Sequence, residues 1–165
     1  MGRFAGVLPF ARDPSGATHF LLACEAMGRE QGSWSGFAGK PEDVDGGCVL
    51  TTAAREAHEE SSGVLGDQAA LRDLLRRCGT RVDTETGTHF LLELDMSSQL
   101  PEAFQGAQAA IRASMPARVA YSPFLEKSCV RWFAMADLDC GRWRLRSGFR
   151  ADLAALVAAV GKREP

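Results

Sequence analysis

Residues 50–65, LTTAAREAHEESSGVL, hold the pattern from which the rest of the chain can be interpreted. Small and apolar side chains recur at positions i, i+3, i+4 and i+7, which is the buried stripe of an amphipathic helix. These are Leu50, Ala53, Ala54 and Ala57. At roughly 100° per residue, Glu56, Glu59 and Glu60 share a second arc of the same helix. Their mutual repulsion costs about 0.2–0.5 kcal/mol per pair, so we expect a hard divalent cation to favour the arrangement.

Length and composition indicate one globular domain spanning residues 1–165. Of the 165 residues, 45% are hydrophobic and 24% are charged, a balance that supports a packed core and argues against disorder. The formal net charge of -2 argues against strong general binding to nucleic acid or to anionic membranes. A phosphorylated small molecule is still compatible, because it needs only local positive charge.

The five cysteines favour a reducing compartment. Their number is odd, their spacing is wide and no C-x-x-C occurs, so we expect neither a disulfide framework nor a zinc site. Residues 1–13 are too short and too soon interrupted by charge for a signal peptide, and no apolar run approaches about 18 residues. We therefore expect a cytoplasmic protein without membrane contact, and a homodimer stays open.

Interleaved strand and helix patterns predict an α/β or α+β sandwich rather than a helical bundle. Strands are expected at residues 3–11, 18–23, 81–83, 88–95 and 128–133, with a hairpin turn at residues 13–16. Besides the acidic helix, helices are expected at residues 68–78, 101–113 and 149–160. Asp67 and Ser147 are the expected N-caps of two of them, and Gly63 is the expected C′ residue of the acidic helix.

Metal chemistry is a natural use for the acidic helix. Mg²⁺ and Mn²⁺ prefer oxygen ligands, and a bound ion would neutralise a pyrophosphate and activate water. Arg55 could orient a neighbouring carboxylate through a bidentate hydrogen bond. Taken alone, however, a glutamate pair on a helix is more often a solvated face, and an arginine more often forms a surface salt bridge.

The combination of motifs resembles the Nudix box, whose general form is G-x5-E-x7-R-E-U-x-E-E-x-G-U, where U is apolar. The matching residues are Gly39-Lys40-x-Glu42 and then Ala53-Ala54-Arg55-Glu56-x-x-Glu59-Glu60-x-x-Gly63. Upstream, Trp34-x-x-Phe37-x-Gly39-Lys40 resembles the strand that enters the box in many members. Downstream, Glu126-Lys127, Val130-x-Trp132-Phe133 and Asp137-Leu138 look like the strand that often follows.

This resemblance implies a fold and an activity. The fold would be an α/β/α sandwich of the Nudix type with a mixed central sheet. The activity would be that of a pyrophosphohydrolase dependent on Mg²⁺ (or Mn²⁺), which cleaves a nucleoside diphosphate linked to another group by water attack on phosphorus. The implied partner is thus a small nucleotide-type substrate, whose binding residues and identity the motifs leave unassigned.

The resemblance also implies roles for particular residues. Metal ligands would be the Gly39 carbonyl, Glu56, Glu59 and Glu60. Arg55 would orient an acid of the box, and Glu126 is the candidate for a later catalytic carboxylate that serves as general base. Together with Glu56 and Glu59, these two residues make up the expected catalytic set.

Two departures from the box concern its ends. The acid expected eight residues before Arg55 falls on Gly47, in a loop about two residues longer than the standard form, so Glu42, Asp43 or Asp45 could take its role. Ser62 stands where the box glycine is expected.

A second interpretation is a catalytically silent Nudix-fold module that binds a nucleotide or serves in regulation. Retention of every R-E-x-x-E-E residue argues against it, because a pure binder does not need them. The arginines at 142, 144, 146 and 150 are interpreted as a solvated face. Four aromatic residues near the motifs are expected in the core: Trp34, Phe37, Trp132 and Phe133.

Overall fold

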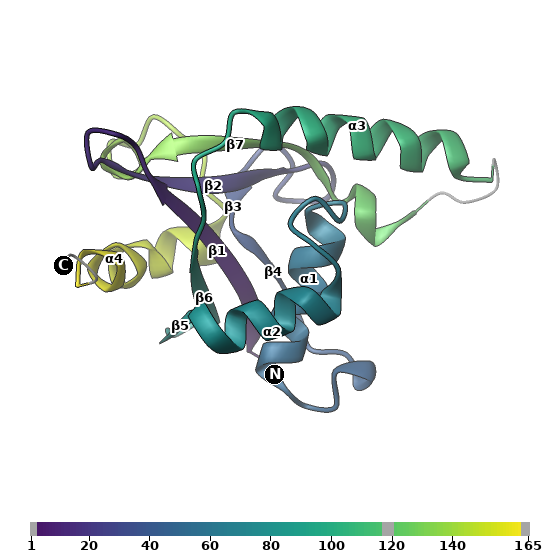
Figure 1. Cartoon of the computed structure of the whole chain (residues 1–165), viewed down its shortest axis with the longest axis horizontal. Coiled ribbons are helices and arrows are strands. Elements are labelled where there is room, and N and C mark those ends of the chain that lie inside the picture. Colours follow the sequence, from purple (N-terminus) through teal and green to yellow (C-terminus); the bar gives the residue numbers. More distant parts are fainter. Residues whose placement is uncertain (1–2, 117–120, 163–165) are drawn as a thin grey trace.

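The computed structural model describes residues 3–116 and 121–162, which form a mixed β-sheet between layers of helices (Figure 1). The sheet has the strand order β3-β2-β1-β6-β5, with β4 paired to β1 and β7 paired to β2. Its strands are β1 (Phe4–Arg12), β2 (Thr18–Glu25), β3 (Trp34–Ser35), β4 (Phe37–Gly39), β5 (Thr80–Asp83), β6 (Gly87–Glu93) and β7 (Lys127–Ala134). The predicted sandwich with a mixed sheet is confirmed, since β1 runs parallel to β6 and antiparallel to β2 and β4.

A split between the first two strands shapes the centre of the sheet. β1 and β2 pair only near their turn, from Phe10↔Phe20 to Arg12↔Thr18. Beyond that point they diverge, so β3 pairs with β2 and β4 pairs with β1. β4 thereby brings Gly39 against the helix that follows it in the chain.

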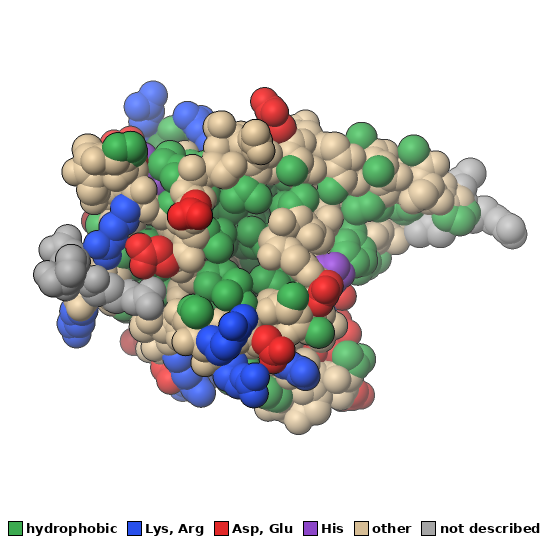
Figure 2. Space-filling model, viewed as in Figure 1, with side chains coloured by type: hydrophobic (Ala, Val, Ile, Leu, Met, Phe, Trp, Pro, Cys, Tyr) green, Lys and Arg blue, Asp and Glu red, His purple; other side chains and the backbone are tan. Residues whose placement is uncertain are grey.

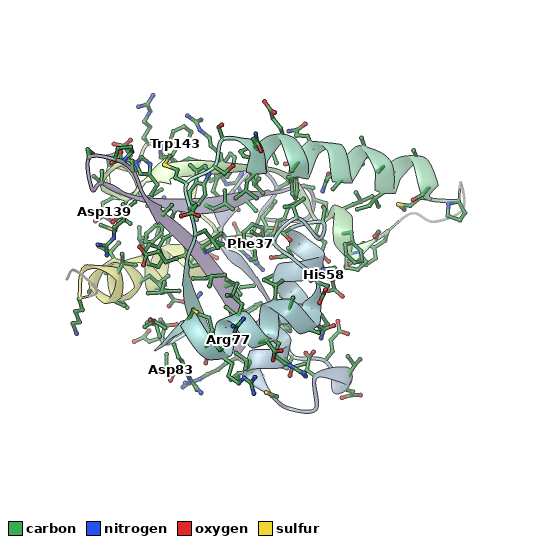
Figure 3. All side chains as sticks on the ribbon, viewed as in Figure 1. Phe37, His58, Arg77, Asp83, Asp139 and Trp143 are labelled. Carbon is green, nitrogen blue, oxygen red and sulfur yellow. The ribbon has the colours of Figure 1, made fainter. Side chains whose placement is uncertain are left out.

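Two hydrophobic cores flank the sheet, because successive residues of a strand point to opposite faces. Ala5 and Val7 of β1 belong to the core shared with α1 (Val49–Glu60), α2 (Gln68–Cys78) and α3 (Gln99–Ser114). Leu8 and Phe10 belong to the core shared with α4 (Ser147–Gly161). Phe37 lies between the sheet and α1 (Figure 3). The expected core position is confirmed for Phe37 and Phe133, whereas Trp34 and Trp132 are partly buried and pack against the two cores.

The expected helices and strands are confirmed close to their expected bounds, and α2 shows why. Asp67 accepts a hydrogen bond from the N–H of Ala70 at 2.8 Å, and Gly79 follows the last helical residue. Both ends of α2 are therefore set by the residues that flank it. The described part of the chain also contains three short 3₁₀ turns: η1 (Asp43–Asp45), η2 (Pro123–Leu125) and η3 (Met135–Asp137).

The expected N-cap at Ser147 is wrong. Arg146 is the N-cap of α4, and the Ser147 hydroxyl donates to Oε1 of Glu30 at 2.7 Å. The cause is a contact distant in sequence, since the N–H of Trp34 donates to Arg144 O at 2.8 Å and the N–H of Arg146 donates to Trp34 O at 2.9 Å. These bonds hold the chain extended beside β3 until the helix begins.

The expected C′ residue of α1 is also wrong by one position. Ser61 is the C-cap, and Ser62 already has a left-handed φ of 55°, followed by Gly63 with a φ of 81°. A serine at positive φ is strained, but its hydroxyl donates to Phe124 O at 2.8 Å and accepts from Nε2 of Gln108 at 3.2 Å. Ser62 thus fills the position of the box glycine and ties α1 to η2 and α3.

The surface in Figure 2 carries Lys and Arg interspersed with Asp and Glu over the region of α2, with no patch of a single sign on that face. Within residues 3–116 and 121–162, no helix has the length and apolarity needed to cross a membrane.

Two glycine-to-alanine substitutions should have opposite effects on stability. A Cβ atom at Gly6 would lie 2.2 Å from the Cβ of Ala38 and 2.3 Å from Phe37 O, so Gly6→Ala must separate β1 from β4. We expect it to lower the free energy of unfolding by about 3 kcal/mol. Gly106 is exposed within α3, and a Cβ atom there would meet nothing within 4 Å. Gly106→Ala should therefore raise the free energy of unfolding by about 0.5–1 kcal/mol. Urea unfolding measures both, and equal effects would contradict the close approach of β4.

Candidate active site

α1 carries the candidate catalytic side chains and is held against the sheet by its smallest residues. Ala53, Ala54 and Ala57 are fully buried in the core between α1 and the sheet. The closest approach is at Gly39, where a Cβ atom would lie 2.1 Å from Oε1 of Glu56. A side chain at Gly39 would therefore displace the Glu56 carboxylate from the backbone of β4.

The buried guanidinium of Arg55 is the common partner of several carboxylates. Nε donates to Oδ1 of Asp45 at 3.0 Å and Nη2 donates to Oδ2 at 3.1 Å. Nη1 lies 2.9 Å from Oε1 of Glu56, 3.0 Å from Oε2 of Glu59 and 3.6 Å from Oε1 of Glu42. Because the donors of a guanidinium are fixed in one plane, Arg55 fixes the position of the η1 loop relative to the acids of α1.

Asp45 is buried and its carboxylate is well supplied with donors. Besides Arg55, the Thr52 hydroxyl and the N–H of Glu42 each donate to Oδ2 at 2.9 Å. Burial acts to raise the pKa of Asp45, but the hydrogen bonds from Arg55, Glu42 and Thr52 outweigh it, so this pKa lies below its ordinary value. Asp45 is therefore ionised at neutral pH and pairs with Arg55 as an anion.

Among the three acids that the sequence left open, Asp45 is the one that makes the bidentate contact with Arg55. Glu42 is 60% exposed at its side chain, and Asp43 is exposed. Asp45 also follows Gly39 by six residues, so the extra residues of the loop come after it. They include Gly46 and Gly47, which have positive φ values of 58° and 72° and turn the chain into α1.

Glu60 and Lys127 form a second, fully buried ion pair. Lys127 Nζ lies 2.9 Å from Oε1 of Glu60 and also bonds to Glu25. The other oxygen of Glu60 accepts the N–H of Ala38 at 2.8 Å. Burial acts to lower the pKa of Lys127, but attraction by Glu60 and Glu25 outweighs it, so this pKa lies above its ordinary value. Arg146 reaches the same oxygen of Glu25 at 3.3 Å.

Both Glu60 and Glu56 have a raised pKa. Burial raises the pKa of Glu60 to about 8, although Lys127 opposes the rise. Burial raises the pKa of Glu56 to about 7, and the charges of Glu59 and Glu126 add to the rise, while Arg55 opposes it. A carboxylate with such a pKa gains from any nearby cation that favours its ionised form.

The acids of α1 face a cavity of about 400 Å³. Six acidic side chains line it: Glu25, Glu42, Glu56, Glu59, Glu60 and Glu126. Three basic residues line it: Lys40, Arg55 and Arg146. Glu126 accepts a hydrogen bond from the Tyr121 hydroxyl, which also belongs to the cavity wall.

A second cavity of about 640 Å³ adjoins the first and shares Phe4, Ala38, Lys40 and Arg146 with it. Its wall also includes the first turn of α4, through Ser147, Gly148 and Phe149, and His89 of β6. Nε2 of His89 lies 2.8 Å from Oδ2 of the buried Asp152, so the ring is held in place from the α4 side.

Solved structures resemble this chain over nearly its whole length, whereas no sequence model of a protein family and no curated protein sequence matches it. The Nudix hydrolase RenU from M. smegmatis aligns with a TM-score of 0.56 and 17% identity, over 99% of this chain and 88% of that one. A proposed Nudix hydrolase from Listeria monocytogenes aligns with a TM-score of 0.53 and 15% identity, over 98% and 96%. The bifunctional NMN adenylyltransferase/ADP ribose pyrophosphatase of Francisella tularensis, solved with AMP and a Mn ion, has a TM-score of 0.53 and 14% identity, over 98% of this chain and 41% of that one.

The chain has the Nudix fold. Within this fold, the residues expected from the Nudix box come together as a group. Gly39, Arg55, Glu56, Glu59, Glu60 and Glu126 all line the 400 Å³ cavity. They come from β4, from α1 and from the segment before β7, so the fold joins parts of the chain far apart in sequence.

The donor types at this cavity of the Nudix fold fit a hard divalent cation, because they are carboxylates and a backbone carbonyl. Their present arrangement is drawn toward Arg55 and Lys127. Among the described residues, no three His, Cys, Asp or Glu side chains group closely enough to hold an ion as they stand. An ion would therefore compete with these two side chains for the oxygens of α1.

Sequence reasoning missed three charged residues of the site: Glu25, Lys127 and Arg146. Lys127 was noted only as part of the motif that follows the box, but its side chain is fully buried. Arg146 was grouped with a solvated face, but it lines both cavities. Glu25 and Lys127 oppose one another across β2 and β7, which a strand register would have revealed.

Removing the charge of Asp45 should destabilise the chain in a pH-dependent manner. Asp45→Asn leaves Arg55 without its bidentate partner, so we expect the free energy of unfolding to fall by about 3 kcal/mol at pH 7. Because the folded pKa of Asp45 lies below the ordinary 3.8, its contribution is present above about pH 4 and is lost as pH falls through the folded pKa. The difference between wild type and variant should therefore narrow below pH 4.

Urea unfolding at a series of pH values measures this difference. The matched control is Asp43→Asn, an exposed acid in the same 3₁₀ turn, which should change stability by less than about 0.5 kcal/mol. Equal effects of the two substitutions would contradict the role of Asp45.

Proposed function

We propose that this chain is a Nudix hydrolase that uses Mg²⁺ or Mn²⁺ to cleave a nucleoside diphosphate linked to another group, by attack of water on phosphorus. The observation that carries the proposal is the convergence of Gly39, Arg55, Glu56, Glu59, Glu60 and Glu126 on one cavity. The fold shared with RenU supports it. So does the excess of acidic over basic side chains around the cavity, which a divalent cation would offset.

The residues of α1 and β4 would hold the ion. The ligands expected from the box are the Gly39 carbonyl, Glu56, Glu59 and Glu60. The first three would hold one ion, and Glu60 would contribute to a second ion where one binds. A bound ion would supply Lewis acidity and lower the pKa of water. The raised pKa values of Glu56, about 7, and Glu60, about 8, mark carboxylates whose ionised form a bound cation would favour. Arg55 keeps the carboxylates of Glu56 and Glu59 turned toward the cavity.

Glu126 is the proposed general base. It comes from the segment before β7 rather than from α1, it lines the same cavity as Glu56, and its charge contributes to the raised pKa of Glu56. Tyr121 donates to one oxygen of Glu126 and orients the carboxylate. Glu126 would accept the proton of the attacking water from that position.

The two adjoining cavities suggest where the two parts of a substrate would bind. The diphosphate would lie between the 400 Å³ cavity and the shared residues Lys40 and Arg146, whose positive charges suit phosphate oxygens. A ring or sugar would occupy the 640 Å³ cavity beside Phe4 and Phe149. The Francisella structure with AMP and a Mn ion supports a nucleotide and a divalent ion as the ligands to test first.

The cytoplasm is the proposed place of action. The odd number and wide spacing of the five cysteines support a reducing compartment.

Glu56→Gln tests the catalytic assignment. The variant keeps the shape of the side chain but loses its charge, so we expect kcat on the best substrate to fall by at least about 100-fold. The substrate comes from a panel of nucleoside diphosphate derivatives incubated with Mg²⁺ or Mn²⁺, with products identified by mass spectrometry. Glu102→Gln, an exposed acid of α3, is the matched control and should keep full activity. Turnover that survives Glu56→Gln would refute the assignment, and wild-type binding of nucleotides without turnover would favour the silent module.

Arg146→Gln tests the proposed placement of the substrate phosphates between the two cavities. Because Arg146 lies where the two cavities meet, its loss should remove a charged contact to phosphate and raise KM about 10–100-fold, with a smaller change in kcat. Arg142→Gln, an exposed arginine that stacks on Trp143, is the control and should leave KM unchanged. An unchanged KM in Arg146→Gln would place the phosphates elsewhere.

A further inference from the structure

We propose that Lys127 is a resident cation of the active site, which takes the place at Glu60 that a second divalent ion would otherwise occupy. The chain would then bind a single divalent ion in the absence of substrate, on the side of Glu56 and Glu59. This inference rests on the proposed function, because it presupposes a divalent ion at α1. Paired divalent ions are a recurrent solution for phosphate chemistry, so a single ion would set this site apart.

The geometry of Glu60 carries the first step. One carboxylate oxygen lies 2.9 Å from Lys127 Nζ, and the other accepts the N–H of Ala38 at 2.8 Å. Both oxygens are thus engaged by the protein, in a place where the side chain of Glu60 is only 3% exposed. An ion bridging through Glu60 would have to displace the ammonium group or approach it closely.

The placement of Lys127 carries the second step, because the fold fixes it. Lys127 opens β7 directly opposite Glu25 of β2, next to a register shift between Cys24 and Glu25. Its carbonyl accepts from Nε2 of Gln108 at 2.7 Å, which anchors the backbone to α3. The side chain is fully buried, so it cannot leave for solvent without opening the sheet edge.

The distribution of charge carries the third step. Glu60 and Glu25 share two cations, Lys127 and Arg146. On the other side of the cavity, four carboxylates share the single guanidinium of Arg55: Glu42, Asp45, Glu56 and Glu59. The uncompensated negative charge therefore lies at Glu56 and Glu59, and repulsion from Lys127 disfavours a further cation beside Glu60.

The experiment counts ions on the intact chain with Mn²⁺ alone as the probe. Electron paramagnetic resonance of free Mn²⁺ during a titration gives the number bound and their Kd, and thermal unfolding with and without Mn²⁺ gives a second readout. Wild type should bind one Mn²⁺ per chain. Lys127→Met should bind a second Mn²⁺, or bind one about tenfold more tightly, and its Tm should depend more strongly on Mn²⁺ than that of wild type. Lys162→Met, an exposed lysine after α4, is the control and should behave as wild type.

A double variant keeps the test decisive if Lys127→Met does not fold without metal. Lys127→Met with Glu60→Gln removes both charges of the pair, so it should bind a single Mn²⁺ with the affinity of wild type. A second ion that persists in this double variant is not held by Glu60 and overturns the inference. Two or more ions on wild type, with no change in Lys127→Met, also overturn it while leaving the proposed hydrolase intact. Absence of Mn²⁺ binding and of turnover in wild type would refute the proposed function itself.

Discussion

The buried guanidinium of Arg55 is the interaction on which the geometry of the site depends. It joins the η1 loop to α1 through Asp45 and gathers Glu56 and Glu59 toward the same cavity. Charges removed from water need partners, so none of these groups could keep its place without the others. The alanines of α1 make the arrangement possible, because they let the helix approach β4 until Glu56 contacts the backbone at Gly39.

Sequence reasoning predicted the fold wherever local signals settle it. α2 matches its expected bounds because Asp67 and Gly79 end it on both sides. The start of α4 was predicted wrongly because hydrogen bonds to Trp34, far away in the chain, decide where that helix begins. The end of α1 was predicted wrongly for a similar reason. Ser62 adopts a left-handed φ that is supported by contacts with η2 and α3, and no local pattern reveals these contacts.

In the candidate site too, some residues could be predicted from local sequence and others depend on contacts distant in sequence. Helical spacing alone brings Glu56, Glu59 and Glu60 together, and the motif adds Gly39, Arg55 and Glu126, all of which line one cavity. The lengthened loop left three acids open, and only its folded path selects Asp45 as the partner of Arg55. The burial of Lys127 was not predicted, because a lysine beside a glutamate normally indicates a solvated position. The pairing of β7 with β2 buries Lys127 opposite Glu25.

The two cations of the site therefore act differently on the acids of α1. Lys127 pairs with Glu60 inside the fold, where burial nevertheless raises the pKa of this carboxylate to about 8. Arg55 is shared among four carboxylates, and the pKa of Glu56 rises to about 7. Glu56 and Glu60, one helical turn apart, thus differ in the protein groups that contact their carboxylates. Both oxygens of Glu60 are engaged by Lys127 and by the N–H of Ala38, whereas Glu56 and the more exposed Glu59 share Arg55 and can respond to positive charge that enters the cavity.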